Sequence, residues 1–303
     1  MKLIVLPAAL IIAFAGPFAP AGHVRAAEPV TFAIKFPPGQ IDRESTSVEM
    51  DQTISGDALP APRTQSSKKL SSDTLTLIES NAMGSTVKMT YGKSTASGVG
   101  VDVSGDNDKA AAAVGESITL HFSPTGRIEK VEGLDAIEAK IRAQSGQGAG
   151  PPQLLLSADG IKELYNSPLD QFLPRTPVRI GDTWESEISR KYPAPAAKIK
   201  NKVKLVDVEE RNGHRIAKLE FTGAVSMEDD LAFGGGVGKI KFDRCEQDGT
   251  AEFDLTRGWW TVLAVEERNN GKMLINPPGG RSLSFTFTQT LKARIVTKPE
   301  SAK

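Results

Sequence analysis

The sequence predicts a mainly β protein of the α+β class: a long curved antiparallel sheet or open half-barrel with a helical segment between its two halves. Three observations carry this prediction. Apolar residues recur with a period of two through most of the chain, which places them on one face of successive strands. The last apolar run is unusually long, and one region in the middle of the 303 residues has helical spacing instead.

The strongest strand signal lies near the end of the chain. Its apolar phase is broken only by Gln289 and holds Leu283, Phe285, Phe287, Leu291, Ala293 and Ile295. At about 3.3 Å per residue the segment 283–295 is roughly 43 Å long, whereas strands usually have about five or six residues. A strand of this length is expected to twist and coil around a core.

Alternation begins close to the start of the chain. The first predicted strand carries Val30, Phe32, Ile34 and Phe36, and a second is expected over 48–54. The next element is a predicted hairpin around 81–85 that pairs Leu75 and Leu77 with Val87, Met89 and Tyr91. Residues 57–67 and 94–115 are rich in small and polar residues, so we predict loops there.

Further hairpins follow from turn residues. Residues 118–131 predict one around the turn at 123–126. Asn212-Gly213 is the strongest hairpin signal in the chain, and Asp248-Gly249 predicts another. The strands expected beside these turns and after the helical region lie at 178–188, 203–208, 216–221, 240–245 and 251–255.

The sequence pattern typical of helices is confined to residues 133–175. Leu134, Ile137 and Ile141 recur at spacings of three and four. A second piece contains Ile161, Leu164, Tyr165, Leu169 and Phe172 and ends before Pro174 and Pro177, because proline cannot continue a helix. These helices are expected to cover one face or end of the sheet.

We predict one β-rich domain over 27–303. Its alternative organisation is two similar halves, 27–132 and 178–298, joined by the helical segment. The alternative rests on residues 118–131 and 251–265, which share a strand, a turn ending in glycine and a second strand.

The first 26 residues read as a signal peptide. Lys2 precedes an apolar run from 3 to 14, which is shorter than the roughly 18 residues that would span a bilayer, and Val24-Arg25-Ala26 suits signal peptidase. We therefore expect cleavage near Ala26 and a secreted or periplasmic protein without a transmembrane segment after processing.

Charge and cysteine usage limit the partners. The chain has 37 basic and 37 acidic residues, so it lacks the basic excess of a nucleic-acid binder. Alternation places its densest lysine group on one solvated strand face: Lys198, Lys200, Lys202 and Lys204. Cys245 is the only cysteine and falls opposite the apolar phase set by Ile240 and Phe242. It is expected to be an inert thiol or, as the less favoured alternative, an accessible one that forms an intermolecular bridge.

Two glycine-containing motifs do not predict nucleotide binding. Gly92-Lys93-Ser94 resembles the end of a phosphate-binding loop, but Val87 stands where the first glycine is needed and no helical text follows. Residues 234–238 contain several glycines, but Lys239 takes the place of the third fingerprint glycine. We predict a hinge or tight hairpin there, and no cofactor.

Metal and catalytic patterns are equally incomplete. The acidic residues at 102, 106 and 108 lack the glycine and the final glutamate of a calcium loop, and residues 228–230 are expected to be a solvated turn. Zinc ligands have no recognised spacing. His121 and His214 are expected to be ordinary surface residues rather than catalytic ones.

Tryptophans are expected to serve packing. Trp259 and Trp260 are adjacent in a strand, so they face opposite sides. Burial of both is the favoured interpretation, and an exposed aromatic contact is the alternative. Trp184 is predicted to be a packing anchor.

The chain has short structural motifs in Gly181-Asp182-Thr183-Trp184 before a strand, in the turn at 123–126 and in its long hairpins. In these it resembles an uncharacterised family of secreted bacterial β-rich proteins. More distantly, by architecture alone, it resembles open half-barrels of the lipoprotein-carrier type, whose concave face shelters acyl chains. Neither resemblance implies catalytic residues.

Three functions follow in order of preference. The first is a non-enzymatic exported protein that binds a lipid or other apolar ligand, or a protein of the envelope. The second is a structural or assembly module that presents a sheet edge or the tryptophan pair. The third is an extracytoplasmic hydrolase, which would require two carboxylates about 5 to 10 Å apart in a cleft.

Overall fold

A computed structural model describes residues 28–37, 41–56, 59–145, 157–190, 196–227, 231–233, 237–276 and 279–299. The predicted signal peptide and the acidic turn at 228–230 lie outside these residues, as does most of the glycine segment at 234–238. The first strands are β1 (Ile41–Gly56), β2 (Arg63–Asn81), β3 (Gly84–Val99), β4 (Ser117–Phe122) and β5 (Ile128–Glu132). The later strands are β6 (Thr183–Arg190), β7 (Ala197–Arg211), β8 (His214–Met227), β9 (Leu231–Phe233), β10 (Gly238–Asp254), β11 (Trp259–Ile275) and β12 (Leu283–Pro299). The helices are α1 (Ser104–Ala113), α2 (Leu134–Ser145) and α3 (Ala158–Phe172).

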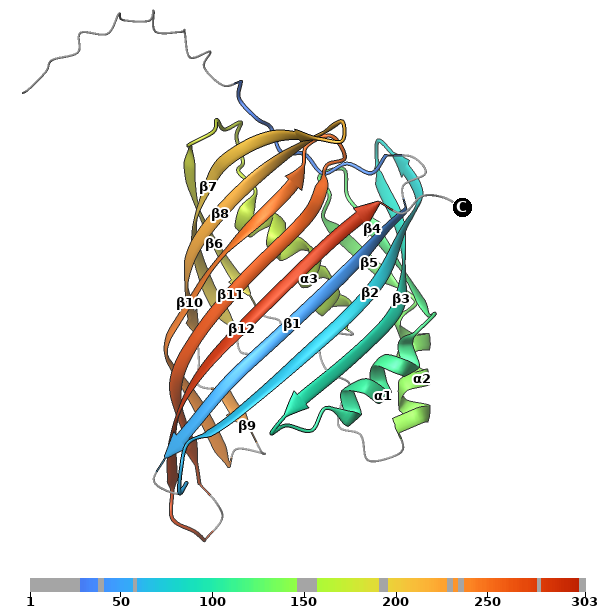
Figure 1. Cartoon of the computed structure of the whole chain (residues 1–303). Coiled ribbons are helices and arrows are strands. Elements are labelled where there is room, and N and C mark those ends of the chain that lie inside the picture. The colour runs from blue at the N-terminus through green and yellow to red at the C-terminus, as the bar shows by residue number, and fades with distance from the viewer. Residues whose placement is uncertain are drawn as a thin grey trace, which may run out of the picture.

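The described strands form one antiparallel sheet in the order β5-β4-β3-β2-β1-β12-β11-β10-β8-β7-β6, with β9 paired to β10 (Figure 1). The long strand predicted near the end of the chain lies at the centre, paired with β1 on one side and β11 on the other. Phe285 and Phe287 are buried on its inner face, and Ile295 packs beside the core. The predicted one-faced strand is therefore confirmed.

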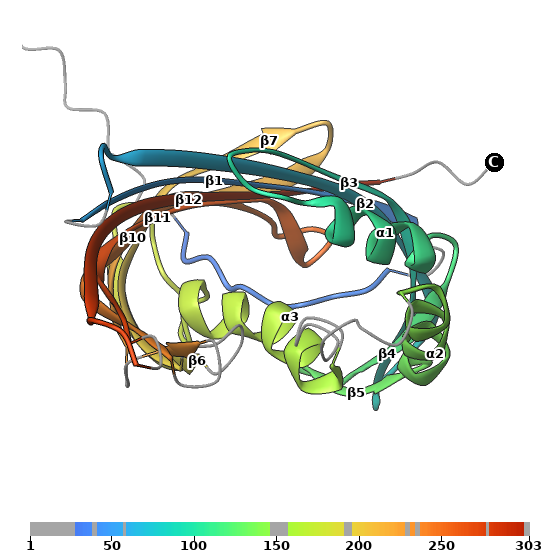
Figure 2. The ribbon, with the colours of Figure 1, turned by 90° about the horizontal axis from the view of Figure 1, so that it is seen from below.

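The sheet is curved and open, and α3 lies across its open side (Figure 2). This helix contacts both end strands, β5 and β6. The predicted mainly β class with a long open antiparallel sheet is confirmed, and so are the helices predicted within residues 133–175. Ile137, Ile141 and Phe172 are buried, whereas Leu164 is exposed.

The segment 28–37 is not the strand that its alternation predicts. It crosses the interior as an extended chain between the sheet and α3 (Figure 2). Only Val30 forms a β-bridge, in which its N–H donates to Val178 O at 2.6 Å and its C=O accepts from Val178 N at 3.0 Å. The alternation reflects an extended backbone with two different sides, because Phe32, Ile34 and Phe36 pack against the core while Thr31, Ala33 and Lys35 are exposed.

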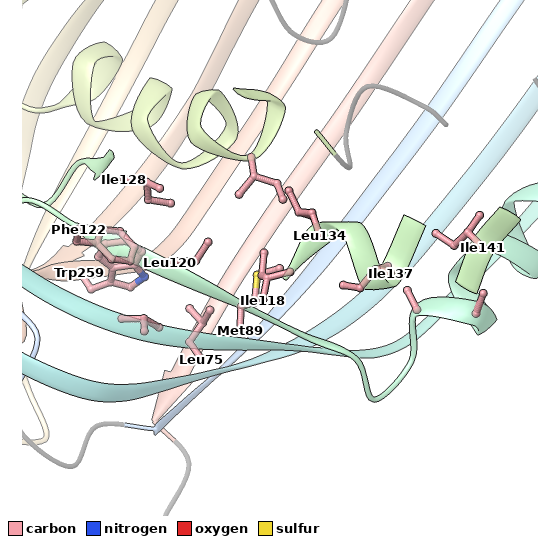
Figure 3. Packing of buried hydrophobic residues seen from close by; sticks show 14 residues of the cluster. Leu75, Met89, Ile118, Leu120, Phe122, Ile128, Leu134, Ile137, Ile141 and Trp259 are labelled. Carbon is pink, nitrogen blue, oxygen red and sulfur yellow. The ribbon is translucent and has the colours of Figure 1, made fainter. Parts of the chain in front are cut away.

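Of the three hydrophobic clusters among the described residues, the two larger ones meet at the tryptophan pair. Trp259 belongs to the first, with Leu120 and Phe122 (Figure 3), and Trp260 belongs to the second, with Phe172. Ile34 packs against both clusters. Burial of both tryptophans is thus confirmed, at 5% and 6% exposure. The dipeptide links the two clusters.

The loop predicted over 94–115 is wrong. Strand β3 continues to Val99, and α1 then runs beside its far half. The alanines that suggested a mobile segment are good helix formers, and Ala112 and Ala113 are buried in the first cluster. The loop predicted over 57–67 is also too long, because β2 begins at Arg63.

The hairpin predicted at Asp248-Gly249 is wrong as well, since β10 passes straight through it. A Cβ at position 249 would collide with the Ala264 carbonyl oxygen and lie 2.6 Å from the ring of Phe221. Glycine is there for close approach, not for a turn. The hairpins at Asn212-Gly213 and around 81–85 are confirmed.

Two asparagines cover exposed strand edges. On α3, Asn166 Oδ1 accepts from Ile128 N at 2.8 Å and Nδ2 donates to Ile128 O at 3.1 Å. On α1, Asn107 makes the same pair of bonds to Ala96, at 2.6 and 2.9 Å. Each side-chain amide imitates one residue of a neighbouring strand.

Candidate functional site

A groove of about 1280 Å³ follows one side of β6. One wall is the strand over residues 183–189, and the other is formed by Asp170 on α3 and the proline-containing segment after it. Small-molecule pockets usually hold about 300–1,000 Å³ and are mostly apolar. This groove is larger and largely polar, so it suits an extended polypeptide better than a small molecule.

Backbone groups of β6 point into the groove. Gly181 N donates to Leu205 O at 2.7 Å, and Leu205 N donates to Asp182 O at 3.1 Å. Bonded residues alternate along an antiparallel ladder, so Trp184, Ser186 and Ile188 bond to β7. The N–H and C=O groups left for the groove are those of Thr183, Glu185, Glu187 and Ser189. Among the described residues, no backbone hydrogen bond joins these four to another strand.

The edge stays open because α3 ends beside it. The helix stops at Phe172, and Pro174 and Pro177 follow. Ser186 Oγ donates to Gln171 O at 2.7 Å. This bond uses a side chain on the inner face of β6, so the helix holds the strand in place without pairing with its edge.

The outer face of β6 carries a regular charge pattern. Glu185 lies opposite Lys202 and Glu187 lies opposite Lys200, whose Nζ is 3.1 Å from Glu187 Oε2. The predicted solvated lysine face is confirmed, since Lys198 and Lys204 are exposed on the same side. The two glutamates thus occupy the middle of the edge strand.

A second candidate is an acidic pair in the interior. Glu44 and Asp73 lie directly opposite each other on β1 and β2. Tyr165 OH donates to Glu44 Oε1 at 3.1 Å. Burial, followed by the charge of Asp73, raises the pKa of Glu44 to about 7. Burial also raises the pKa of Asp73, although its Oδ1 accepts a hydrogen bond from Gly92 N.

This acidic pair has little room beside it. Glu44 is 8% exposed, and the adjoining apolar cavity measures about 10 Å³ and is lined by Leu75, Tyr165 and Trp259. That volume holds a single water at most. Through the hydrogen bond from Tyr165, the acidic pair joins the sheet to α3.

Amide side chains form a polar layer farther along the interior. Gln247 Nε2 donates to Asn201 Oδ1 at 2.6 Å, and both approach Gln171 Oε1 at 3.4 Å. In the next layer, Asn269 Nδ2 donates to Glu267 Oε1 at 2.9 Å. Gln171 lies on α3, so the first layer fixes the helix against β7 and β10.

His121 and His214 are half-exposed and lie on different strands. His121 Nε2 is 3.1 Å from Glu132 Oε2, and His214 Nδ1 is 2.8 Å from Asp254 Oδ2. Within the described ranges, no group of three or more His, Cys, Asp or Glu residues is placed to hold a metal ion. Residues 92–94 belong to β3, and the acidic residues near 102–108 lie at the start of α1.

The expectation that Cys245 lies on the accessible strand phase is wrong. The side chain is 5% exposed, because an irregularity in the β10–β11 register between Phe242 and Arg244 shifts the phase by one residue. Burial, followed by the charge of Glu267, raises its pKa to about 11. Trp184 packs partly buried against the second cluster, as predicted.

Sequence reasoning missed both candidate sites. The edge of β6 depends on where α3 ends, and the pairing of Glu44 with Asp73 depends on strand register. The only sequence signals were the alternation of residues 184–188 and the prolines after α3, which predict a strand and a helix end but not an open edge.

Fold and groove together define a mainly β protein on one open sheet, with a polar groove beside its edge strand β6. The chain belongs to DUF6263, a family of unknown function, whose model matches residues 66–260. No curated protein matches the chain significantly. None of the helices in the described part of the chain has the length and apolar character needed to cross a membrane.

Solved structures give only remote similarity. DynF from the dynemicin biosynthesis pathway of Micromonospora chersina is 7% identical, with 92% of each chain covered and a TM-score of 0.19. A DUF1329 family protein from Desulfovibrio piger is 14% identical, with 88% of each chain covered and a TM-score of 0.15. OccAB4 of Acinetobacter baumannii is 9% identical over 86% of this chain and 98% of that one, at a TM-score of 0.18. At such TM-scores these similarities carry no argument about function.

Proposed function

We propose that this protein is an exported, non-enzymatic binding module of the cell envelope that takes an extended segment of a partner protein along β6. The observation that carries the proposal is the groove beside an unpaired strand edge. Edge strands commonly bind peptides by adding a strand, in which backbone hydrogen bonds supply affinity. At the other end of the sheet, Asn166 occupies both backbone groups of Ile128, the first residue of β5, whereas β6 offers a longer free edge beside a groove.

Export is supported by the sequence of residues 1–26, and a non-enzymatic role by the surroundings of the titratable groups. Glu44 is buried and Asp73 is half-buried, and Cys245 has a raised pKa, which disfavours the thiolate. His121 and His214 pair with carboxylates on separate strands. A hydrolase remains the third alternative, and it would need the acidic pair to open to substrate.

Site-specific photo-crosslinking in cells tests the proposal. A photoreactive amino acid at Thr183, exposed on the free edge, is expected to trap a partner. The matched control is Ser284, which is exposed on the outer face of β12 in the middle of the sheet. Ser189→Pro removes an N–H that points into the groove and leaves the β7 ladder intact, so it should abolish the adduct at Thr183. An adduct of equal yield at Ser284, or one that survives Ser189→Pro, contradicts the proposal.

An apolar ligand is the second candidate. Its support is the inner face of the long central strands beyond α3, where side chains such as Ile54 and Met273 are half-buried. The rings of Phe242 and Phe287 meet edge to face there, with centroids 5.5 Å apart. Native mass spectrometry of protein purified from its host should then show a bound lipid that Met273→Gln removes and Lys272→Gln, on the outer face, retains. An unliganded mass contradicts this candidate.

A further inference from the structure

We infer that the free edge of β6 selects an extended segment with basic side chains at alternate positions. This inference rests on the proposed function, because it names the chemistry of the segment that the groove takes. It follows from the two glutamates in the middle of the strand and from how the chain already satisfies them on the other side.

The paired side of β6 shows which side chains suit this strand. Glu185 and Glu187 face the outer surface, and β7 places Lys202 and Lys200 directly opposite them. Residues opposite each other in an antiparallel pair have Cβ atoms about 4.5–5.5 Å apart. A strand added at the free edge would place its own outward side chains at a similar separation from the same carboxylates. Lysine or arginine at every second position repeats the match that β7 makes.

The opposite wall does not reverse this preference. Arg127 Nη1 pairs with Asp170 Oδ1 at 2.6 Å, just as Lys200 Nζ pairs with Glu187 Oε2 at 3.1 Å on the strand wall. Arg175 also lines that wall and is exposed. The strand wall, where cross-strand neighbours meet, carries Glu185 and Glu187.

A second copy of this chain fits the edge poorly. Among the antiparallel registers that bring the free N–H and C=O groups of two β6 strands together, the two with the greatest overlap place Glu185 against Glu187 or Glu187 against itself. Like charges directly opposite are destabilising, and charged edges are a common device against self-pairing. The occupant is therefore a different, basic segment.

Peptide binding to the full chain tests the inference. The probe is the peptide Lys-Ile-Lys-Asn-Lys-Val-Lys-Leu, the sequence of residues 198–205, with matched peptides that carry Ser or Glu in place of each Lys. Fluorescence anisotropy should rank affinities as basic, then neutral, then acidic. The double variant Glu185→Gln/Glu187→Gln should weaken the basic peptide by roughly 2- to 30-fold and leave the neutral peptide unchanged.

Variants of the β6 edge distinguish a failure of the charge preference from a failure of the proposed function. Ser189→Pro should abolish binding of every peptide without altering charge, and Glu187→Pro compared with Glu187→Gln repeats the test should Ser189→Pro fail to fold. Equal binding of basic and acidic peptides that Ser189→Pro abolishes overturns the charge preference and leaves the proposed function standing. Binding that ignores both prolines, or no binding at all, overturns the proposed function. A dimer in sedimentation equilibrium that Ser189→Pro dissociates identifies a second copy as the occupant and overturns the basic partner.

Discussion

Asn166 completes the edge of the sheet at Ile128, because its side-chain amide accepts from Ile128 N at 2.8 Å and donates to Ile128 O at 3.1 Å. The bond pair replaces one residue of a strand that the fold lacks. Exposed edges invite pairing with other chains, and natural sheets cover or charge them. At one end of the sheet, the Asn166 amide thus pairs with the backbone of Ile128, whereas no other strand of the described part of the chain pairs with the outer edge of β6.

Replacing Asn166 should show how much its two hydrogen bonds to Ile128 contribute to stability. Asn166→Leu leaves both backbone groups of Ile128 without a partner in a half-buried site, so we expect a loss of about 1–3 kcal/mol in the free energy of unfolding. Urea denaturation measures the loss. Asn270→Leu, exposed on the outer face of β11, serves as the control and should change little. An equal effect of the two substitutions would refute the edge-covering role.

The interior N-terminal segment depends on a glycine. Gly126 has φ +79°, and a Cβ there would collide with Ile34. Gly213 also has φ +79° but has nothing within 4 Å of the Cβ position. Both alanine substitutions incur a left-handed backbone cost of about 1–2 kcal/mol, so Gly126→Ala should destabilise the protein more than Gly213→Ala does. Comparable melting temperatures for the two variants would show that Ile34 does not pack as described.

The acidic pair should make stability depend on pH. The folded chain holds the pKa of Glu44 at about 7, above the ordinary value of 4.5, so between these values the folded state binds more protons than the unfolded state. The contribution of Glu44 is therefore fully present below pH 4.5 and is lost as pH rises through 7, by roughly 3 kcal/mol in total.

Glu44→Gln tests this pH dependence, because glutamine stays neutral and still accepts from Tyr165. Denaturant unfolding at several pH values should show a flatter profile between pH 4.5 and 7 for this variant. Glu220→Gln, on the exposed outer face of β8, should keep the slope of the parent protein. A Glu44→Gln profile as steep as the parent profile would count against a buried, protonated Glu44.

Cys245 should be inert while the chain is folded. Its pKa of about 11 against an ordinary 9 lowers the thiolate fraction by about 100-fold near neutral pH, and burial slows access further. Mass spectrometry after exposure to a thiol reagent at pH 8 should show no label on the native protein and complete labelling in denaturant. Rapid native labelling would place the side chain on the outer face.

The elements that the sequence predicts correctly are those with local causes. Asn212 and Gly213 adopt φ of 55° and 79°, which few other residues tolerate, so their hairpin is readable from two letters. The spacing of Ile137 and Ile141 likewise predicts α2, because residues four positions apart lie on the same face of a helix. The similarity of the two halves stays a prediction, as do export and the absence of enzymatic activity.

The wrong predictions share one cause: a local sequence pattern whose structural reason is a contact with residues far away in the chain. Gly249 resembles a turn residue but makes room for Phe221 and the Ala264 carbonyl. The apolar phase around Cys245 is shifted by an irregularity in the β10–β11 register, and no residue type in the sequence predicts that irregularity. Of the candidate site, the sequence predicts the strand β6 but not its open edge, because that edge depends on where α3 ends in space.

By itself the sequence determined the class of the fold, the long one-faced central strand, the helical interruption and the burial of both tryptophans, since periodicity and turn chemistry act over a few residues. Only the tertiary structure decided that residues 30–36 cross the interior, that Glu44 meets Asp73, and that β6 keeps a free edge. Those features depend on which strands become neighbours, and neighbours in a sheet are chosen by the packing of the whole chain rather than by any segment of it.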